Sequence, residues 1–407
     1  MALRNCAGGK AVAAMPSDRG MNPSGRGAFP AIRAIVCLPR TTGFASMVNS
    51  TALNAFHRRL GARMVDFGGW DMPMNYGSQI EEHHAVRRAA GMFDVSHMSV
   101  IDLTGSQVRA FLQRLMANDV DKLKAAGKAQ YTCMLNADGG IIDDLIVYFL
   151  GEERYRLVGN AGTRAKDLAW INEQAKGFAV SVVEHSDLAM IAIQGPEARA
   201  RVGAIVSPEA AAKAKALKRF SAVSHDGLFI ARTGYTGEDG YEITLPATDA
   251  EAFWQALLDA GVQPCGLAAR DTLRLEAGMN LYGQDMDETT TPLTTSLAWT
   301  VSMAPERDFI GRDRLLAQQA QGVAEQLVGL VLEGKGIMRH GQSVIAGDGE
   351  GLVTSGTFSP TLERTIALAR IPAGDIETVQ VDIRGRQVPA RVVAPPFVRN
   401  GEPQHGL

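Results

Sequence analysis

Apolar residues recur at helical spacing in several segments of the chain. The first segment covers residues 51–60, with Thr51 as its expected N-cap and Gly61 as its stop. A second helix is expected over residues 78–90. A third follows Ser106, where every apolar residue matches the helical period. The pattern therefore predicts short amphipathic helices, each with one face against a core.

Strand patterns lie between these helices. Residues 92–103 predict one strand, and residues 131–135 and 141–150 flank a turn rich in Asn, Asp and Gly, which is typical of a hairpin. Strand and helix patterns then alternate as far as residue 277. Helices mixed with antiparallel hairpins predict an α+β fold rather than a doubly wound parallel sheet.

The pattern changes after an expected helix near residues 312–319. Short strands separated by Gly, Pro and Asp turns are expected at residues 326–332, 351–358, 366–371, 379–383 and 388–393. This spacing predicts a small β-barrel or sandwich of about 85 residues. We place the boundary near residue 320, which gives a body of residues 48–320 and a C-terminal domain of residues 321–407.

The first 46 residues differ from the rest in composition. They carry six basic residues against one acid, Asp18, and no apolar period persists there. An Arg-rich, acid-poor leader is typical of an organellar transit segment. Alternatively, translation begins at Met47 and the leader is an extension without function. Both readings leave residues 1–46 outside the fold, and we expect them to be disordered.

Charge and composition exclude several classes of protein. The chain has 41 basic and 44 acidic residues, a net charge of −3, and without the leader the count is 35 against 43, or −8. A dedicated nucleic-acid binder carries a basic surplus instead, and no apolar run is long enough to span a membrane. The four cysteines form no CxxC pair, so neither a zinc ribbon nor a dense disulfide framework is expected.

The common catalytic motifs are absent from the sequence. It contains no phosphate-binding loop, no HExxH and no GxSxG. The adjacent His83 and His84 point about 100° apart on a helix, so they cannot chelate a metal together, and no metal site is expected. Any chemistry is therefore expected to rest on groups that substrates or cofactors carry.

Six segments place polar residues against glycine and aromatic residues. They read DFGGWDMP from Asp66, MFDVSHM from Met92, GYTGEDGYE from Gly234, GLAARDTLRLEAG from Gly266, LYGQDMD from Leu281 and TSGTFSP from Thr354. In this order they resemble the aminomethyltransferases of the glycine cleavage system, the T-protein family. The resemblance runs from about Leu53 to Arg399.

This resemblance implies a reaction. Members of the family use tetrahydrofolate and take an aminomethyl group from the lipoyl arm of the H-protein. The products are ammonia, 5,10-methylenetetrahydrofolate and the reduced dihydrolipoyl H-protein. The lipoyl sulfur and the folate nitrogens supply the bond-making atoms, which explains the missing nucleophile motif. The expected fold is an interleaved pair of folate-binding α+β domains with a small C-terminal β-barrel.

Asp94 is the first candidate catalytic residue. Its neighbours from Met92 to Met98 are mostly apolar, and a carboxylate in such a place costs free energy unless it is paired or functional. The resemblance implies that the key aspartate of the family stands here, where it positions the folate and stabilises developing positive charge. From the residues alone, an aspartate that caps a backbone turn is the alternative.

Glu242 and Arg270 are the main candidate folate contacts. The resemblance implies a glutamate at position 242, whose carboxylate could accept two N–H groups from the pterin edge. The alternative is a solvent-facing strand residue. It also implies an arginine at position 270, whose planar fork suits a carbonyl or a carboxylate. Arg274, one helical turn further on, is expected to pair with Asp271 or Glu276 instead.

Four further residues complete the candidate site. Arg399 is expected to approach the folate tail from the C-terminal domain, although surface solvation is the default for a residue near the chain end. Asn118, Tyr131 and Tyr235 are expected to line the pocket by stacking or hydrogen bonding. For the two tyrosines, core packing with a satisfied hydroxyl is the alternative. Trp299 is expected in the core.

Two other functions occur on the same fold. One is a folate-dependent demethylase of a small methylated substrate, and the other is a non-catalytic folate-binding factor of iron–sulfur assembly. The second is disfavoured, because residues 276–282 lack the Lys-Gly-Cys-Tyr signature of those relatives. The expected partners are lipoylated H-protein and tetrahydrofolate, with no nucleic acid and no membrane, and a monomer is expected. The location is cytoplasmic if translation begins at Met47, which we favour, or the mitochondrial matrix if residues 1–46 are a transit segment.

Overall fold

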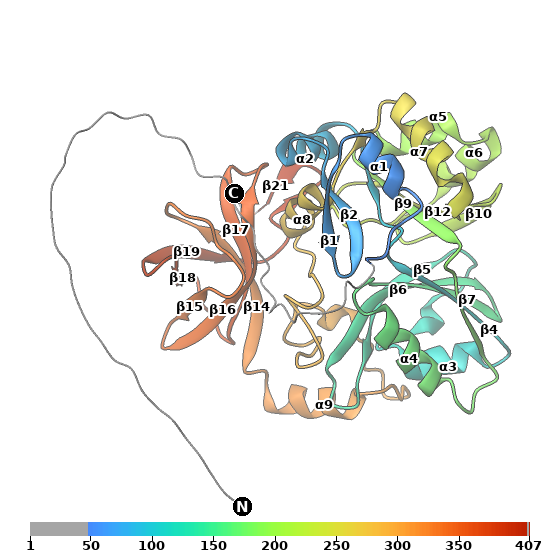
Figure 1. The fold of residues 1–407 in the computed structure, drawn as a ribbon. Helices are drawn as coiled ribbons and strands as arrows, with labels where there is room; N and C mark the ends of the chain where they lie inside the picture. Colours follow the sequence, from blue (N-terminus) through green and yellow to red (C-terminus); the bar gives the residue numbers. More distant parts are fainter. Residues whose placement is uncertain (1–47, 405–406) are drawn as a thin grey trace, which may run out of the picture. The chain divides into compact units, whose positions relative to one another are not determined.

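Helices and strands alternate along the chain in the order that Figure 1 colours from blue to red. The computed structural model describes residues 48–404 and 407, so the predicted leader lies outside the described residues. From Met47 onward the chain forms one compact unit. Within the described residues, no helix is long and apolar enough to cross a membrane.

A six-stranded sheet forms one half of the body. Across the sheet the strands are β10 (Ala222–His225), β11 (Leu228–Ala231), β12 (Gly240–Pro246), β9 (Leu188–Gln194), β3 (Gly91–Asp94) and β13 (Gln263–Pro264). All neighbours are antiparallel except β3 and β13. One apolar core joins this sheet to α5 (Ala198–Ile205), α6 (Pro208–Ala216) and α7 (Ala250–Asp259) around the fully buried Trp254.

A five-stranded antiparallel sheet forms the other half. Its order is β5 (Ala129–Leu135), β6 (Ile141–Gly151), β7 (Arg154–Gly159), β4 (Ser99–Thr104) and β8 (Ser181–Glu184). A second core joins it to α3 (Val108–Leu115) and α4 (Arg164–Gln174). The apolar positions of α3 all pack into this core, as the helical period predicts.

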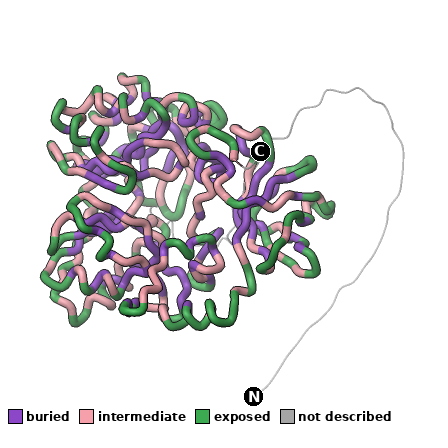
Figure 2. The backbone as a smooth tube through the Cα atoms, turned by 180° about the vertical axis from the view of Figure 1, so that it is seen from behind, coloured by how far each residue is buried: buried purple, intermediate pink, exposed green. Residues whose placement is uncertain are grey.

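The two halves are interleaved in the chain, which confirms the predicted fold class. The single strand predicted at residues 92–103 is wrong: it is two strands, β3 and β4, which belong to different sheets. The turn at residues 95–98 carries the chain from one sheet to the other. A third core lies between the sheets, where Phe93 of β3 and Tyr148 of β6 join Leu273. Figure 2 shows buried backbone running through these central strands.

The N-terminal elements and α8 complete the packing around the six-stranded sheet, on both of its faces. They are α1 (Asn54–Arg59), the hairpin β1 (Arg63–Phe67) and β2 (Trp70–Asn75), α2 (Gln79–Arg88) and α8 (Leu267–Glu276). Ser78 caps α2 by accepting from the backbone N–H of Glu81. The predicted cap of α1 is wrong: the N-cap is Leu53, and the hydroxyl of Thr51 points elsewhere.

The C-terminal strands close into a six-stranded barrel, as predicted. After α9 (Arg312–Gln321) its order is β14 (Glu325–Leu332), β17 (Arg364–Pro372), β16 (Gly349–Ser359), β15 (Ser343–Ala346), β18 (Thr378–Asp382) and β19 (Gln387–Val393). Strand β15 was not expected from the sequence. It is only four residues long and buries two side chains, so its apolar pattern is short. A short hairpin, β20 (Val398–Arg399) and β21 (Glu402–Pro403), follows the barrel.

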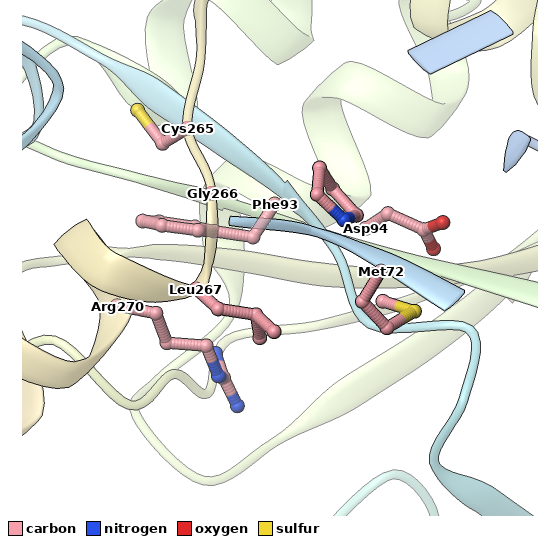
Figure 3. A pocket seen from close by; sticks show the side chains of 8 residues that line it. Met72, Phe93, Asp94, Cys265, Gly266, Leu267 and Arg270 are labelled. Atoms are coloured by element: carbon pink, nitrogen blue, oxygen red, sulfur yellow. The ribbon is translucent and has the colours of Figure 1, made fainter. Parts of the chain in front are cut away.

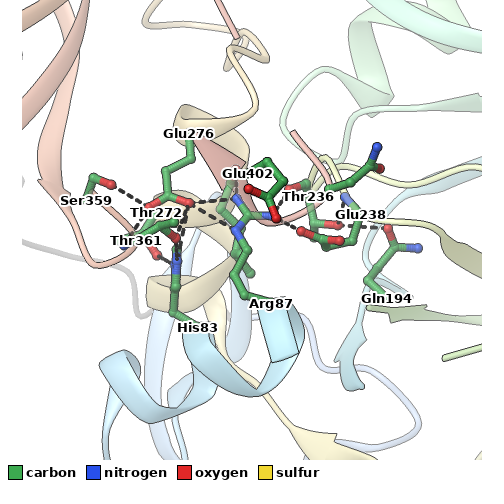
Figure 4. A network of polar contacts seen from close by, with 12 residues as sticks. His83, Arg87, Gln194, Thr236, Glu238, Thr272, Glu276, Ser359, Thr361 and Glu402 are labelled. Atoms are coloured by element: carbon green, nitrogen blue, oxygen red, sulfur yellow. Dashed lines mark hydrogen bonds and ion pairs between the residues drawn. The ribbon is translucent and has the colours of Figure 1, made fainter. Parts of the chain in front are cut away.

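A buried polar network centred on Glu276 of α8 joins the barrel to the body (Figure 4). Its carboxylate accepts from Ser359 Oγ at 2.5 Å and Thr361 Oγ1 at 2.8 Å on the barrel side. On the body side it accepts from Arg87 Nη2 at 2.7 Å, and His83 Nε2 lies 3.3 Å away. His83 thus lies between two threonine hydroxyls and Glu276, where it helps to join the barrel to the body.

Candidate active site

Asp94 ends β3 and is buried, with 3% of its surface exposed. Its Oδ2 accepts from Thr51 Oγ1 at 2.6 Å and from His57 Nε2 at 2.9 Å, and its Oδ1 accepts from the backbone N–H of Ser96 at 2.9 Å. Burial alone would raise the pKa of Asp94, but these donors hold it below its ordinary value. Asp94 is therefore an ionised carboxylate whose protein contacts use both oxygens.

The contacts continue behind Asp94 through His57. The Tyr76 hydroxyl lies 2.8 Å from His57 Nδ1, and the edge of the Trp254 ring packs against the imidazole. His57 can donate from Nε2 to Asp94 and accept from Tyr76 at Nδ1, so both of its ring nitrogens have a partner. Nothing in the sequence indicated that His57 and Thr51 are partners of Asp94, because they lie 37 and 43 residues away from it along the chain.

A narrow hollow beside Asp94 lies between β3 and the start of α8, and it is too small to hold a water molecule. Its lining is Met72, Pro73, Phe93, Asp94, Cys265, Gly266, Leu267 and Arg270. Two predicted site residues, Asp94 and Arg270, thus share one hollow. Their charged groups nevertheless point away from each other (Figure 3).

Arg270 lacks a full set of partners. Its Nη1 is buried and has no hydrogen-bond partner within the described residues. Its guanidinium lies over the Tyr235 ring, 4.7 Å from the centroid. Burial lowers the pKa of Arg270, while Glu242 and Tyr235 act in the opposite direction. A buried cation with an unused donor is a place where an acceptor on a ligand would bind.

Glu242 is the buried acid that faces this cation. It lies on β12 with 8% of its surface exposed, and its Oε2 accepts from Thr233 Oγ1 at 2.6 Å. The Tyr148 hydroxyl lies 3.2 Å from the same threonine oxygen. The alternative of a solvent-facing strand residue is wrong, because the side chain is buried between the two sheets.

Tyr131 and Tyr235 bring a third acid to the site, Asp144, which the sequence analysis missed. The Tyr131 hydroxyl donates to Asp144 Oδ2 at 2.7 Å, and Asn160 Nδ2 donates to Asp144 Oδ1 at 2.9 Å. Burial, with the neighbouring Asp143, raises the pKa of Asp144 to about 7. Tyr235 lies near enough to feel the charges of both Asp144 and Arg270, and its hydroxyl donates to the carbonyl of Asn280.

Arg270, Glu242, Tyr235, Tyr131 and Asp144 together are called the central cluster below. Its members come from α8, β12, the loop before β12, β5 and β6, so both sheets contribute. His97 adjoins it: burial lowers its pKa to about 4, with Asp94 and Arg270 both acting on it. His97 is therefore neutral at physiological pH and offers no charge to the site.

Asn118 and Trp299 lie at the edge of the central cluster. Asn118 Nδ2 donates to the Tyr131 carbonyl at 3.0 Å, and the Trp299 ring stacks on the Tyr131 ring at 5.8 Å between centroids. Both residues line a groove of about 400 Å³ with Lys122 and Lys128. The expectation that Trp299 is a core residue is wrong, because 66% of its surface is exposed.

Arg399 lies outside the central cluster. It is exposed and pairs through its backbone with Glu402 in the terminal hairpin. The next residue, Asn400, donates from its backbone N–H to the Gly237 carbonyl, so this hairpin reaches the loop that carries Tyr235. Of the predicted residues, the structure thus groups Arg270, Glu242, Tyr235 and Tyr131 most closely.

Comparison with known proteins agrees with this architecture. The model of the GCVT N-terminal domain matches residues 53–305, and that of the glycine cleavage T-protein C-terminal barrel domain matches residues 325–399. These matches define a two-part fold class, an interleaved α+β body followed by a barrel. The chain belongs to the glycine cleavage T-protein family.

Named relatives place the chain more narrowly within this family. It is 62% identical over 366 residues to the aminomethyltransferase of Xanthomonas campestris pv. campestris (strain 8004), covering 89% of this chain and 99% of that protein. The aminomethyltransferase of Stenotrophomonas maltophilia (strain K279a) is 61% identical over the same shares. The crystal structure of glycine cleavage system aminomethyltransferase T from Bartonella henselae superposes with a TM-score of 0.81 at 35% identity, over 87% of this chain and 99% of that one. The activity of the chain is aminomethyl transfer.

Proposed function

We propose that the central cluster binds tetrahydrofolate and that the chain passes to it the aminomethyl group of lipoylated H-protein. The observation that carries this proposal is the buried Nη1 of Arg270, which has no partner within the described residues. An unpaired buried donor is costly for stability, so its retention favours a ligand-binding role. Glu242 has only one oxygen committed to Thr233.

These two residues fit the two ends of a pterin. The pterin edge offers a ring N–H beside an exocyclic amine, and the free face of the Glu242 carboxylate suits such a pair of donors. The guanidinium of Arg270 suits a ring carbonyl or a carboxylate of the folate tail. The ring of Tyr235, already in contact with Arg270, offers a flat apolar surface for stacking.

Asp144 is suited to hold or move a proton. In the overall reaction two C–N bonds to folate form while one C–N and one C–S bond break, and the two folate N–H protons end on ammonia and the thiol. A carboxyl with a pKa of about 7 can accept and return a proton at neutral pH. Tyr131, which donates to Asp144, would set the orientation of that carboxyl.

Two carboxyls therefore compete for the central role. Asp94 is the one that the resemblance implies, and it remains a candidate for positioning the folate. We favour Asp144, because its pKa of about 7 suits proton exchange at neutral pH, whereas the donors around Asp94 lower the pKa of that carboxyl. We propose Asp144 as the proton-handling group and Asp94 as the anchor that holds the segment around Thr51 and His57.

One assay tests the reaction. Purified protein is mixed with aminomethyl-lipoyl H-protein and tetrahydrofolate, and ammonia and methylenetetrahydrofolate are measured. We expect both products in equal amounts, and no product with an authentic carrier would refute the proposal. The demethylase and the assembly factor predict folate binding without ammonia release, so binding alone does not separate them from the leading function.

We also propose a cytoplasmic location, which the bacterial origin of the relatives supports. The mitochondrial alternative depends on residues 1–46, which lie outside the described residues. A monomer without nucleic-acid or membrane partners stays a prediction of the sequence. Arg399 and Asn118 stay proposed contacts for the outer part of the folate.

A further inference from the structure

Behind the central cluster lie two more carboxyls that the proposed reaction does not use. Asp143 precedes Asp144 on β6 and has none of its surface exposed, and Asp167 on α4 has 3% exposed. Lone carboxylates at such depth cost several kcal/mol unless they are paired or neutral. The two acids therefore require an explanation.

The contacts of the two acids are unequal. Asn160 donates to Asp143 twice, from its backbone N–H at 3.1 Å and from Nδ2 at 2.9 Å. Both oxygens of Asp167 are buried and accept no well-formed hydrogen bond within the described residues. The nearby Thr163 hydroxyl acts on the pKa of Asp167 but donates to the Asn160 carbonyl at 3.1 Å. The Oδ2 atoms of Asp143 and Asp167 both flank Gly159, where an added Cβ would lie 3.2 Å and 3.8 Å from them. Each of these neighbouring carboxyl groups acts on the pKa of the other.

Two carboxyl groups in contact cannot both be ionised in a buried place. We propose that Asp143 and Asp167 share one proton and form a positioning pair, which holds Asn160 and through it Asp144. The proton bridges the pair, so that Asp167 acquires the partner it otherwise lacks. The Asp143 oxygens remain available to the two N–H donors of Asn160.

Asn160 is the link between the pair and the active carboxyl. Its Nδ2 lies 2.9 Å from Asp143 Oδ1 and 2.9 Å from Asp144 Oδ1, so one amide group spans both acids. Tyr131 holds the other oxygen of Asp144. Loss of the shared proton would add a second negative charge behind Asn160 and raise the proton affinity of Asp144, which would then no longer release its proton at neutral pH.

The surroundings favour the protonated pair. Burial and the neighbouring Asp167 raise the pKa of Asp143, and burial raises the pKa of Asp167. The ionisable groups that act on the pair are Cys133, Asp144, Lys166 and Tyr282. The one cation among them, Lys166, is already bound to Glu288 at 2.6 Å.

The shared proton can be tested without any activity measurement. Asp167→Asn keeps the shape of the side chain but removes one carboxyl, and Asp138→Asn on the exposed turn of the same hairpin is the matched control. Because Asp144 is itself partly protonated at neutral pH, the spectra are recorded in the Asp144→Asn background. In that background we expect the infrared carbonyl band of a protonated carboxyl with and without Asp138→Asn, and its loss when Asp167→Asn is added. An Asp144→Asn protein without that band would overturn the proposal.

The pH dependence of the melting temperature is an independent test of the shared proton. An acid whose pKa is raised by folding keeps its proton in the folded state after the unfolded chain has lost it, so stability is full below the unfolded pKa of about 4 and falls as pH rises. The melting temperature of the wild type should therefore fall relative to Asp167→Asn from about pH 4 upward. A constant difference across this range would contradict the shared proton.

The effect on turnover rests on the proposed role of Asp144, whereas the infrared and stability readouts do not. On the alkaline side, wild-type kcat should fall about tenfold per pH unit above the pKa of the pair, and this limb should be absent in Asp167→Asn. An unchanged alkaline limb together with a normal infrared result would refute the positioning role while leaving the shared proton intact.

Discussion

Arg270 and Arg274 lie one turn apart on α8 and have opposite surroundings. Arg274 donates to Asp271 at 2.9 Å, to Asp285 at 2.9 Å and to Ser355 of the barrel at 2.9 Å. Arg270 stacks on Tyr235 and keeps a buried donor unused. Substituting each arginine with methionine, which keeps the long apolar stem, should therefore separate ligand binding from folding.

The size of each effect follows from these contacts. Arg270→Met removes the guanidinium that is proposed to bind folate, and a hydrogen bond to a charged group is worth about 1.5–3 kcal/mol, so folate should bind about 10- to 150-fold more weakly. Its loss of stability should be smaller than that of Arg274→Met, because Arg270 loses a cation–π contact and the attraction of Glu242 but no hydrogen-bonded ion pair. Arg274→Met leaves the fully buried Asp285 without its cation and should cost about 3–5 kcal/mol.

Tetrahydrofolate titration by calorimetry gives the binding constants, and urea unfolding gives the free energies of unfolding. Arg270→Lys serves as a control, since it keeps the charge but loses the planar fork, and it should bind folate with intermediate affinity. The reasoning is refuted if Arg270→Met binds folate normally. It is also refuted if Arg270→Met loses as much stability as Arg274→Met, because Arg270 would then be a structural residue.

Two further predictions concern acids. Asp144→Asn should lower single-turnover ammonia release by about 10²- to 10⁴-fold, while the affinity for folate is kept. If Asp94→Asn abolishes ammonia release and Asp144→Asn does not, the proposed roles of the two acids are reversed. Against the effect of burial, His83 and Arg87 lower the pKa of Glu276 to about 2. The ionised Glu276 should therefore stabilise the folded protein fully above the unfolded pKa of about 4.3, and this stabilisation should be lost as pH falls through about 2. The gap in unfolding free energy between wild type and Glu276→Gln should close over that range, and a gap independent of pH would show that its charge is not what joins barrel and body.

Local patterns predicted the regular elements of this chain but not their long-range partners. The expected strands at residues 326–332 and 366–371 match β14 and β17 closely, because alternate side chains there fill the barrel. Thr51 has the composition of an N-cap, and its local sequence gives no sign that its hydroxyl donates to Asp94 instead. A hydrogen bond across 43 residues depends on the tertiary fold, which no period of apolar residues encodes.

The adjacent acids of β6 carried a signal that sequence reasoning could have used. Asp143 and Asp144 interrupt the strand Ile141–Gly151, most of whose other residues are apolar, and two acids in a buried strand are costly unless both have a purpose. Neighbouring residues of a strand point to opposite faces of the sheet. One acid must therefore lie on the face towards α4, and the other on the face towards the central cluster. Asp144 pairs across the sheet with Cys133, on the same face as Tyr131, whereas Asp143 pairs with Met134. The doublet thus predicts one carboxyl in the site and a second that supports it from behind.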